Sequence, residues 1–214
     1  AMLSLLALPA HAGPGQERLT AFYEATDTIH ARFEQVVKGP DGNVQEESAG
    51  EVWIRRPDRF RWSYERPYAQ EIIGDGESVQ LYDPDLAQLT VRPYSSAMGA
   101  TPSLVLAGGG RLKRHFRVEE QGRSEGLAWV ALVPRNPEET GFKRARVGLA
   151  ADPARVVRFE FTDAFGNRSV MTFSDIALDS AIPAERFRFD PPAGTEIVGP
   201  GPGGAGGAPG AGQP

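Results

Sequence analysis

A cluster of arginines forms the densest group of side chains in this chain that could do chemistry: Arg55, Arg56, Arg59 and Arg61. A guanidinium carries five donors and keeps its charge, so it suits the binding of carbonyl or carboxylate oxygens better than proton transfer. Because strand side chains alternate between faces and Pro57 interrupts the pattern, the cluster cannot share one face. Most of these arginines are expected in solvent at strand edges. Arg56 shares the parity of Val52 and Ile54 and can reach the rim of the face that they line.

The residue types that commonly carry catalysis do not form a catalytic set. The three histidines are His11, His30 and His115, and none lies near a nucleophile motif, since GxSxG and HExxH are absent. The chain has no cysteine, which excludes disulfides, thiol nucleophiles, zinc-thiolate sites and a lipid-modified cysteine at the N-terminus. We therefore expect a protein that is not an enzyme.

Two further motifs invite a metal or phosphate interpretation and fail on spacing. Asp83 and Asp85 flank Pro84, but a calcium loop needs more oxygen ligands at close spacing, so a turn is predicted. The glycines 108–110 precede Arg111 and end a helical pattern, which is the wrong end of a helix for binding an anion. No metal and no cofactor are expected.

Composition is that of one ordinary globular domain with tails. The chain has 214 residues, 40% of them hydrophobic and 24% charged, with a formal net charge of -5 and a sequence pI near 5.3. The acidic balance argues against a nucleic-acid-binding surface. Apart from a short apolar run at the N-terminus, no stretch approaches the roughly 18 to 20 apolar residues of a membrane-spanning helix.

Both ends of the chain differ in composition from the middle. Residues 1–12, AMLSLLALPAHA, pair an apolar run with a small-x-small ending and predict the remnant of a secretory signal peptide, although a buried N-terminal helix is the alternative. Residues 199–214 contain only glycine, proline, alanine and one glutamine, and predict a disordered tail. The domain is therefore expected at 13–198, in an exported, soluble protein of the periplasm.

A stretch of alternating aromatic residues sits where the predicted strands follow one another most closely. Phe60, Trp62 and Tyr64 alternate with polar residues, so their rings must project from one face of a strand. That face needs a cover. Helical spacing of apolar residues predicts a helix at 14–28, and Thr101 and Pro102 predict the start of a short apolar helix that the glycines after Ala107 end.

The remaining pattern is strand, turn, strand. Strands are predicted at 29–37, 44–54, 59–64, 70–73, 78–82, 87–93, 113–119, 127–133, 142–149, 155–163 and 168–178, followed by a helical turn and a short final strand within 183–189. Hairpin connections throughout predict a mainly β (α+β) fold. The expected architecture is a single curved antiparallel sheet that forms an unclosed β-barrel, with the helices as a lid across its mouth.

Several ordered motifs resemble one family. GEVWIRRPDRFRW, then P-x-x-Q-x-I-x-x-DG from Pro67 to Gly76, then LYDPDLAQLTV, TPSLVLAG and FDPPAGTEIV are similar to the periplasmic outer-membrane lipoprotein carrier proteins, the lipoprotein localisation factor A family. The resemblance covers 22–198. It implies an unclosed barrel whose cavity takes the acyl chains of lipoproteins from an inner-membrane ABC-type releasing complex and passes them to an outer-membrane lipoprotein receptor.

The resemblance also assigns expected roles to residues. The lid-latching arginine of the family falls on Arg56, its partner-proximal aromatic on Phe60, and its lid on Leu104, Leu106 and Ala107. Tyr23 contributes to the lid from the first helix, where the family more often has an aliphatic residue. The implied cavity is lined by Val52, Ile54, Phe60, Trp62 and Tyr64.

We also expect a monomer, and the acidic balance predicts that nucleic acid is not among its partners. The receptor of the family has a similar fold but is itself a lipoprotein, so the absence of cysteine favours the carrier. The alternative function is a periplasmic sensor or scaffold of the same fold, which binds acylated envelope proteins without transporting them.

Overall fold

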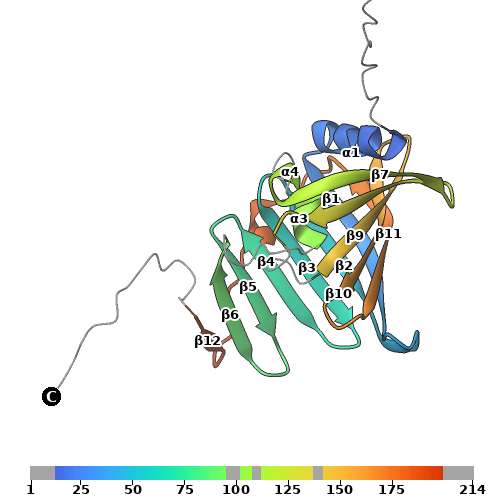
Figure 1. Cartoon of the computed structure of the whole chain (residues 1–214). Helices are drawn as coiled ribbons and strands as arrows, with labels where there is room; N and C mark the ends of the chain where they lie inside the picture. Colours follow the sequence, from blue (N-terminus) through green and yellow to red (C-terminus); the bar gives the residue numbers. More distant parts are fainter. Residues whose placement is uncertain (1–12, 95–101, 108–111, 137–141, 200–214) are drawn as a thin grey trace, which may run out of the picture.

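The computed structural model describes residues 13–94, 102–107, 112–136 and 142–199 (Figure 1). The terminal segments 1–12 and 200–214, which carry the predicted signal remnant and nearly all of the predicted tail, lie outside the described residues. Within those residues no helix has the length and apolar character to cross a membrane. Nor does any group of three or more His, Asp or Glu side chains in the described part of the chain lie where it could hold a metal ion.

One strongly curved sheet forms the body of the molecule (Figure 1). Its described strands are β1 (Thr28–Lys38), β2 (Val44–Arg55), β3 (Arg59–Arg66), β4 (Gln70–Asp75), β5 (Ser78–Asp83), β6 (Gln88–Pro93), β7 (Phe116–Ser124), β8 (Leu127–Pro134), β9 (Phe142–Ala150), β10 (Arg155–Asp163), β11 (Arg168–Leu178) and β12 (Glu196–Val198). The order across the sheet is β12-β6-β5-β4-β3-β2-β1-β11-β10-β9-β8-β7. β12 and β7 stand at the two ends of that order and do not pair with each other, so the barrel is unclosed. The predicted fold class is thereby confirmed.

The pairing is antiparallel at every described strand pair except one. β12 runs parallel to β6, with Ile197 opposite Leu89. The expectation of a purely antiparallel sheet was therefore wrong at this edge. The chain comes to β12 from the segment that contacts β3 and β4 rather than through a hairpin from β6, so the direction of β12 is not set by a tight turn.

Strand β3 shows why the aromatic residues share a face. Trp62 pairs with Val52 and Phe60 with Ile54 on β2, and all four side chains are buried on the concave side. On the other neighbour, Phe60 lies opposite Gly74. A Cβ at Gly74 would lie 2.3 Å from the Phe60 ring, so the absence of a side chain there makes room for the aromatic ring.

Helix α1 (Pro14–Ala25) lies across β7, β8, β9 and β10 and buries Leu19 and Phe22 against them (Figure 1). Its first turn is held by Glu120 of β7, whose carboxylate accepts hydrogen bonds from the amides of Gly15 and Gln16 at 3.0 Å. The helix ends at Ala25, earlier than predicted. Asp179 accepts a hydrogen bond from the Asp27 amide at 2.7 Å, which holds the chain extended on its way into β1.

Two other predicted elements differ. The predicted strand 113–119 begins as helix α4 (Leu112–His115), and β7 starts only at Phe116. Leu112 and Phe116, four residues apart, are both buried, whereas the polar residues between them offer no alternation to support a strand. The predicted final strand within 183–189 was also wrong. That segment holds the 3-10 helix η3 (Ala184–Phe187), which buries Phe187 and contacts β3 and β4.

Candidate functional site

The concave face of β2 and β3 is an apolar surface, and in this structure it is covered. Phe60 and Trp62 are only 2% and 3% exposed, and Val52 and Ile54 are fully buried. The ring of Phe33 from β1 meets Trp62 edge-on at 5.0 Å and Tyr64 at 4.9 Å. All of these residues belong to one cluster with the buried residues of α1 and of α3 (Pro102–Ala107). The residues predicted to line a cavity are therefore together on one face.

Helix α3 supplies the cover over this face. Val105, Leu106 and Ala107 are buried in the cluster and the helix contacts β2 and β3. The indole Nε1 of Trp62 donates a hydrogen bond to Ser103 Oγ at 2.7 Å, which ties the start of α3 to the sheet. The side chain of Leu104, which was predicted to belong to the lid, and the residues around α3, 95–101 and 108–111, lie outside what the structure describes.

Arg56 lies in the turn after β2 and binds both covering segments, α1 and α3, through main-chain oxygens. Its Nε and Nη2 donate to the carbonyl of Leu106 in α3 at 3.1 Å and 2.9 Å. Its Nη1 donates to the carbonyl of Phe22 in α1 at 3.2 Å and also to that of Thr26, just after α1. These oxygens come from the end of each helix, where carbonyls lack an intrahelical partner and carry partial negative charge. One guanidinium therefore binds carbonyls at the ends of both α1 and α3.

Two aromatic rings of α1 enclose the same guanidinium. The centre of the Arg56 guanidinium lies 4.5 Å from the Phe22 ring centre and 4.8 Å from that of Tyr23. Burial lowers the pKa of Arg56, but an arginine remains charged at any physiological pH. Burial likewise raises the pKa of Tyr23, so its phenol keeps its proton and donates a hydrogen bond to the carbonyl of Val105 in α3.

Sequence reasoning placed Arg56, Tyr23, Leu106 and Ala107 at a lid, and the structure brings these four together. Sequence reasoning missed the hydrogen bond between Trp62 and Ser103. No sequence pattern links those positions, because the contact depends on how far α3 folds back over β3.

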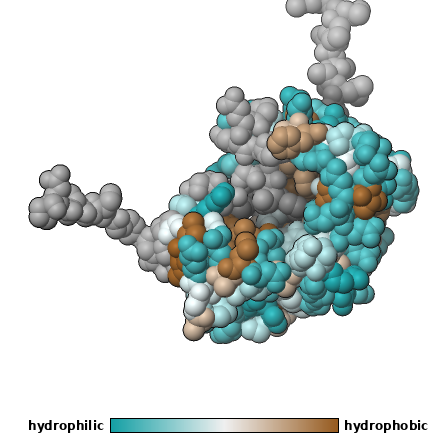
Figure 2. All heavy atoms as spheres, turned by 90° about the horizontal axis from the view of Figure 1, so that it is seen from below, coloured by the Kyte–Doolittle hydropathy of each residue, from teal (hydrophilic) through white to brown (hydrophobic). Residues whose placement is uncertain are grey.

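Seen from below, the molecule is hollowed near its centre, and hydrophobic patches lie among hydrophilic ones on this face (Figure 2).

Known proteins match this chain over most of its length. The model of the family described as outer membrane lipoprotein carrier protein LolA matches residues 24–190. The chain belongs to the LolA family. The matched range includes Arg56, the aromatic strand β3 and all of α3, while nearly all of α1 precedes it. The resemblance carried by the sequence motifs is thereby confirmed.

Individual relatives agree with the family match. An outer-membrane lipoprotein carrier protein of Methylobacillus flagellatus is 43% identical over 185 residues, which cover 86% of this chain and 89% of the relative. Another, of Methylibium petroleiphilum, is 41% identical and covers 92% of this chain and 95% of its own length. The crystal structure of a LolA superfamily protein from Nitrosomonas europaea covers 83% of this chain and 99% of its own, with a TM-score of 0.50 and 14% identity, which supports the fold alone.

Proposed function

We propose that this protein is a carrier of lipoproteins in the periplasm. It binds the acyl chains of lipoproteins that leave the inner membrane and hands them to a receptor at the outer membrane. The proposal is supported by membership of the LolA family and by relatives named as outer-membrane lipoprotein carrier proteins that match over 86% and 92% of this chain. An acyl chain needs no catalysis for this transfer, which agrees with a binding protein rather than an enzyme.

The observation that carries the proposal is the apolar face under α3, together with the way its cover is held. Core packing alone would need no charged residue at the junction of α1 and α3. Here Arg56 reaches three main-chain carbonyls from two covering segments. Such a junction can break and re-form as one unit, because its bonds all depend on one side chain. The cover can then move aside and expose Phe60, Trp62 and their neighbours to an acyl chain.

Magnitudes explain why a carrier needs a competing cover. Burial of a methylene contributes about 0.8 kcal/mol, so enclosure of one long acyl chain would contribute on the order of 10 kcal/mol. A protein that kept this full gain could not release its cargo. Hydrogen bonds from a charged donor contribute about 1.5 to 3 kcal/mol. Closure by Arg56 therefore lowers the net affinity and favours transfer to a receptor without nucleotide hydrolysis at this step.

The partners follow from this role. Upstream is an inner-membrane ABC-type lipoprotein-releasing complex, and downstream an outer-membrane lipoprotein receptor with better apolar complementarity. The proposal includes a monomeric carrier that binds one lipoprotein at a time. Its acidic composition, with a formal net charge of -5, argues against nucleic acid as a partner.

The decisive experiment is the release of a labelled lipoprotein from spheroplasts. Addition of the purified protein should move the lipoprotein from the membrane into solution as a one-to-one complex, and bovine serum albumin at the same concentration serves as the control for nonspecific release. A second step adds outer-membrane vesicles to the isolated complex. Failure to release any lipoprotein would overturn the proposal. Binding without delivery to the vesicles would favour the sensor or scaffold function instead.

A further inference from the structure

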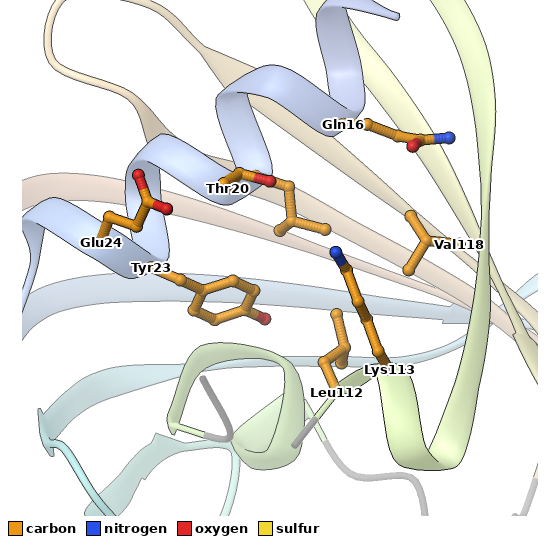
Figure 3. Close-up of a pocket in the computed structure, with 8 residues that line it drawn as sticks. Gln16, Thr20, Tyr23, Glu24, Leu112, Lys113 and Val118 are labelled. Atoms are coloured by element: carbon orange, nitrogen blue, oxygen red, sulfur yellow. The ribbon is translucent and has the colours of Figure 1, made fainter. Parts of the chain in front are cut away.

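A cavity of about 420 Å³ opens between α1 on one side and α4 and β7 on the other (Figure 3). Its volume falls in the range of small-ligand pockets, about 300 to 1,000 Å³. Leu19 and Leu112 are buried and form its apolar inner part, and Val118 of β7 adds a further apolar side. Gln16, Thr20, Glu24 and Lys113 bring polar groups to the same cavity, so its lining combines an apolar floor with polar groups of both charge signs.

The cavity borders the buried cluster that includes the covered apolar face. Leu19 and Leu112 line the cavity and belong to the same cluster as Phe60 and Trp62, and Tyr23, which also lines it, packs against that cluster. In Figure 3, the Tyr23 ring projects from α1 across the cavity on the side of α3 and α4. Its hydroxyl is bound to the Val105 carbonyl of α3. Tyr23 therefore stands between the cavity and the residues that α3 covers.

The fold leaves this place open for a physical reason. β7 ends the sheet, so no further described strand pairs with its outer edge, and α1 lies beside β7 without joining the sheet. The helix is held at its two ends, by Glu120 at the start and Arg56 at the finish. The stretch of α1 that carries Thr20 lies between these anchors. The ammonium of Lys113 has no acidic partner within ion-pair distance in the described part of the chain.

We propose that this cavity is the entrance by which an acyl chain reaches the covered apolar face, and that Tyr23 is its gate. This inference rests on the proposed function. The apolar floor fits methylenes, and Lys113 fits the ester or amide oxygens at the head of an acylated group. Entry requires the Tyr23 ring to swing away and its bond to Val105 to break. The anchor at Glu120 can stay closed while the chain enters, and the Arg56 junction opens when the chain reaches the covered face.

The absence of cysteine makes a reversible block possible. Thr20→Cys places one thiol in the cavity, and Ala21→Cys places one on the exposed side of the same helix, outside the lining. Both variants are labelled with a bulky methanethiosulfonate reagent, and uptake of a fluorescent polyene fatty acid is followed by stopped flow. Labelled Thr20→Cys should associate on the order of tenfold more slowly, which corresponds to about 1.4 kcal/mol of added barrier. A reducing agent should restore the rate.

Tyr23→Phe tests the gate without filling the cavity. Removal of one neutral hydrogen bond should speed uptake by about two- to tenfold, while the ring still packs. If labelled Thr20→Cys takes up the probe as fast as labelled Ala21→Cys, the entrance is elsewhere, and the carrier function stands. If the unlabelled wild-type protein binds no fatty acid and releases no lipoprotein from spheroplasts, the carrier function itself falls.

Discussion

The guanidinium of Arg56 donates two hydrogen bonds to the carbonyl oxygen of Leu106, from Nε at 3.1 Å and from Nη2 at 2.9 Å. The two residues are fifty positions apart in the chain. This pair links the strand β2 side of the sheet to the end of α3, and the same guanidinium links both to α1. The cover of the apolar face therefore depends on a charged side chain whose contribution can be removed by one substitution.

Arg56→Leu should keep lipoprotein binding and impair transfer. The substitution removes hydrogen bonds worth about 1.5 to 3 kcal/mol from the closed form, so the open form gains about tenfold or more in population. The cover then competes less with the bound acyl chain for the apolar face, so the lipoprotein should leave the carrier more slowly. The measurement is delivery from the isolated complex to a purified receptor. Arg59→Leu, at an exposed position on β3, is the matched control. Delivery by Arg56→Leu at the control rate would contradict the role of Arg56.

Ser103→Ala should loosen α3 without touching Arg56. Trp62 Nε1 then loses its acceptor in the closed form, and a buried donor without a partner costs about 1 to 3 kcal/mol. Hydrogen exchange of the amides of α3 should become faster, and an apolar fluorescent dye should bind more strongly to the native protein. Ser174→Ala, at an exposed position on β11, controls for the loss of a hydroxyl. Equal exchange in both variants would show that this bond does not hold α3.

Stability should fall at alkaline pH because of Tyr64. Burial raises the pKa of Tyr64 from 10.0 to about 12, with Glu46 acting in the same direction. A raised folded pKa means that the stabilising effect is complete below pH 10.0, the unfolded value, and is lost as pH rises through about 12. Urea unfolding between pH 9 and about 12 measures how the free energy of unfolding falls as pH rises, and this fall should be smaller in Tyr64→Phe than in the wild-type protein. Tyr68→Phe, at a residue 73% exposed, should keep the wild-type slope, and a flattened slope there would refute the assignment.

Glu120→Ala should release the start of α1. Its carboxylate accepts from the amides of Gly15 and Gln16, and loss of such a cap costs about 0.5 to 2 kcal/mol. The midpoint of unfolding should drop, and hydrogen exchange should rise first in the opening turn of the helix. Glu34→Ala, exposed on β1, provides the comparison. If α1 exchanges at the same rate in both variants, the helix is held by its apolar face alone.

Local patterns predicted most strands because a half-buried strand must alternate. The predicted range 44–54 differs from β2 (Val44–Arg55) by one residue. The predicted turn between β10 and β11 is also present, and Gly166 takes the positive φ of 89° there. The helix α4 was missed because its polar residues Lys113, Arg114 and His115 show neither the two-residue period of a strand nor the 3.6-residue period of a helix. The strand β12 was missed because Glu196–Val198 is exposed, so its residues carry no burial pattern.

The sequence by itself determined which side chains share a face. Parity along β2 put Arg56 with Val52 and Ile54, and parity along β3 put the aromatic rings together, because backbone geometry alone sets that alternation. The tertiary structure decided which partners those faces meet: the carbonyls of Leu106 and Phe22 for Arg56, and Ser103 for Trp62. Period and spacing carry no information on distance through space, so only the folding of α1 and α3 over the sheet could bring these groups together.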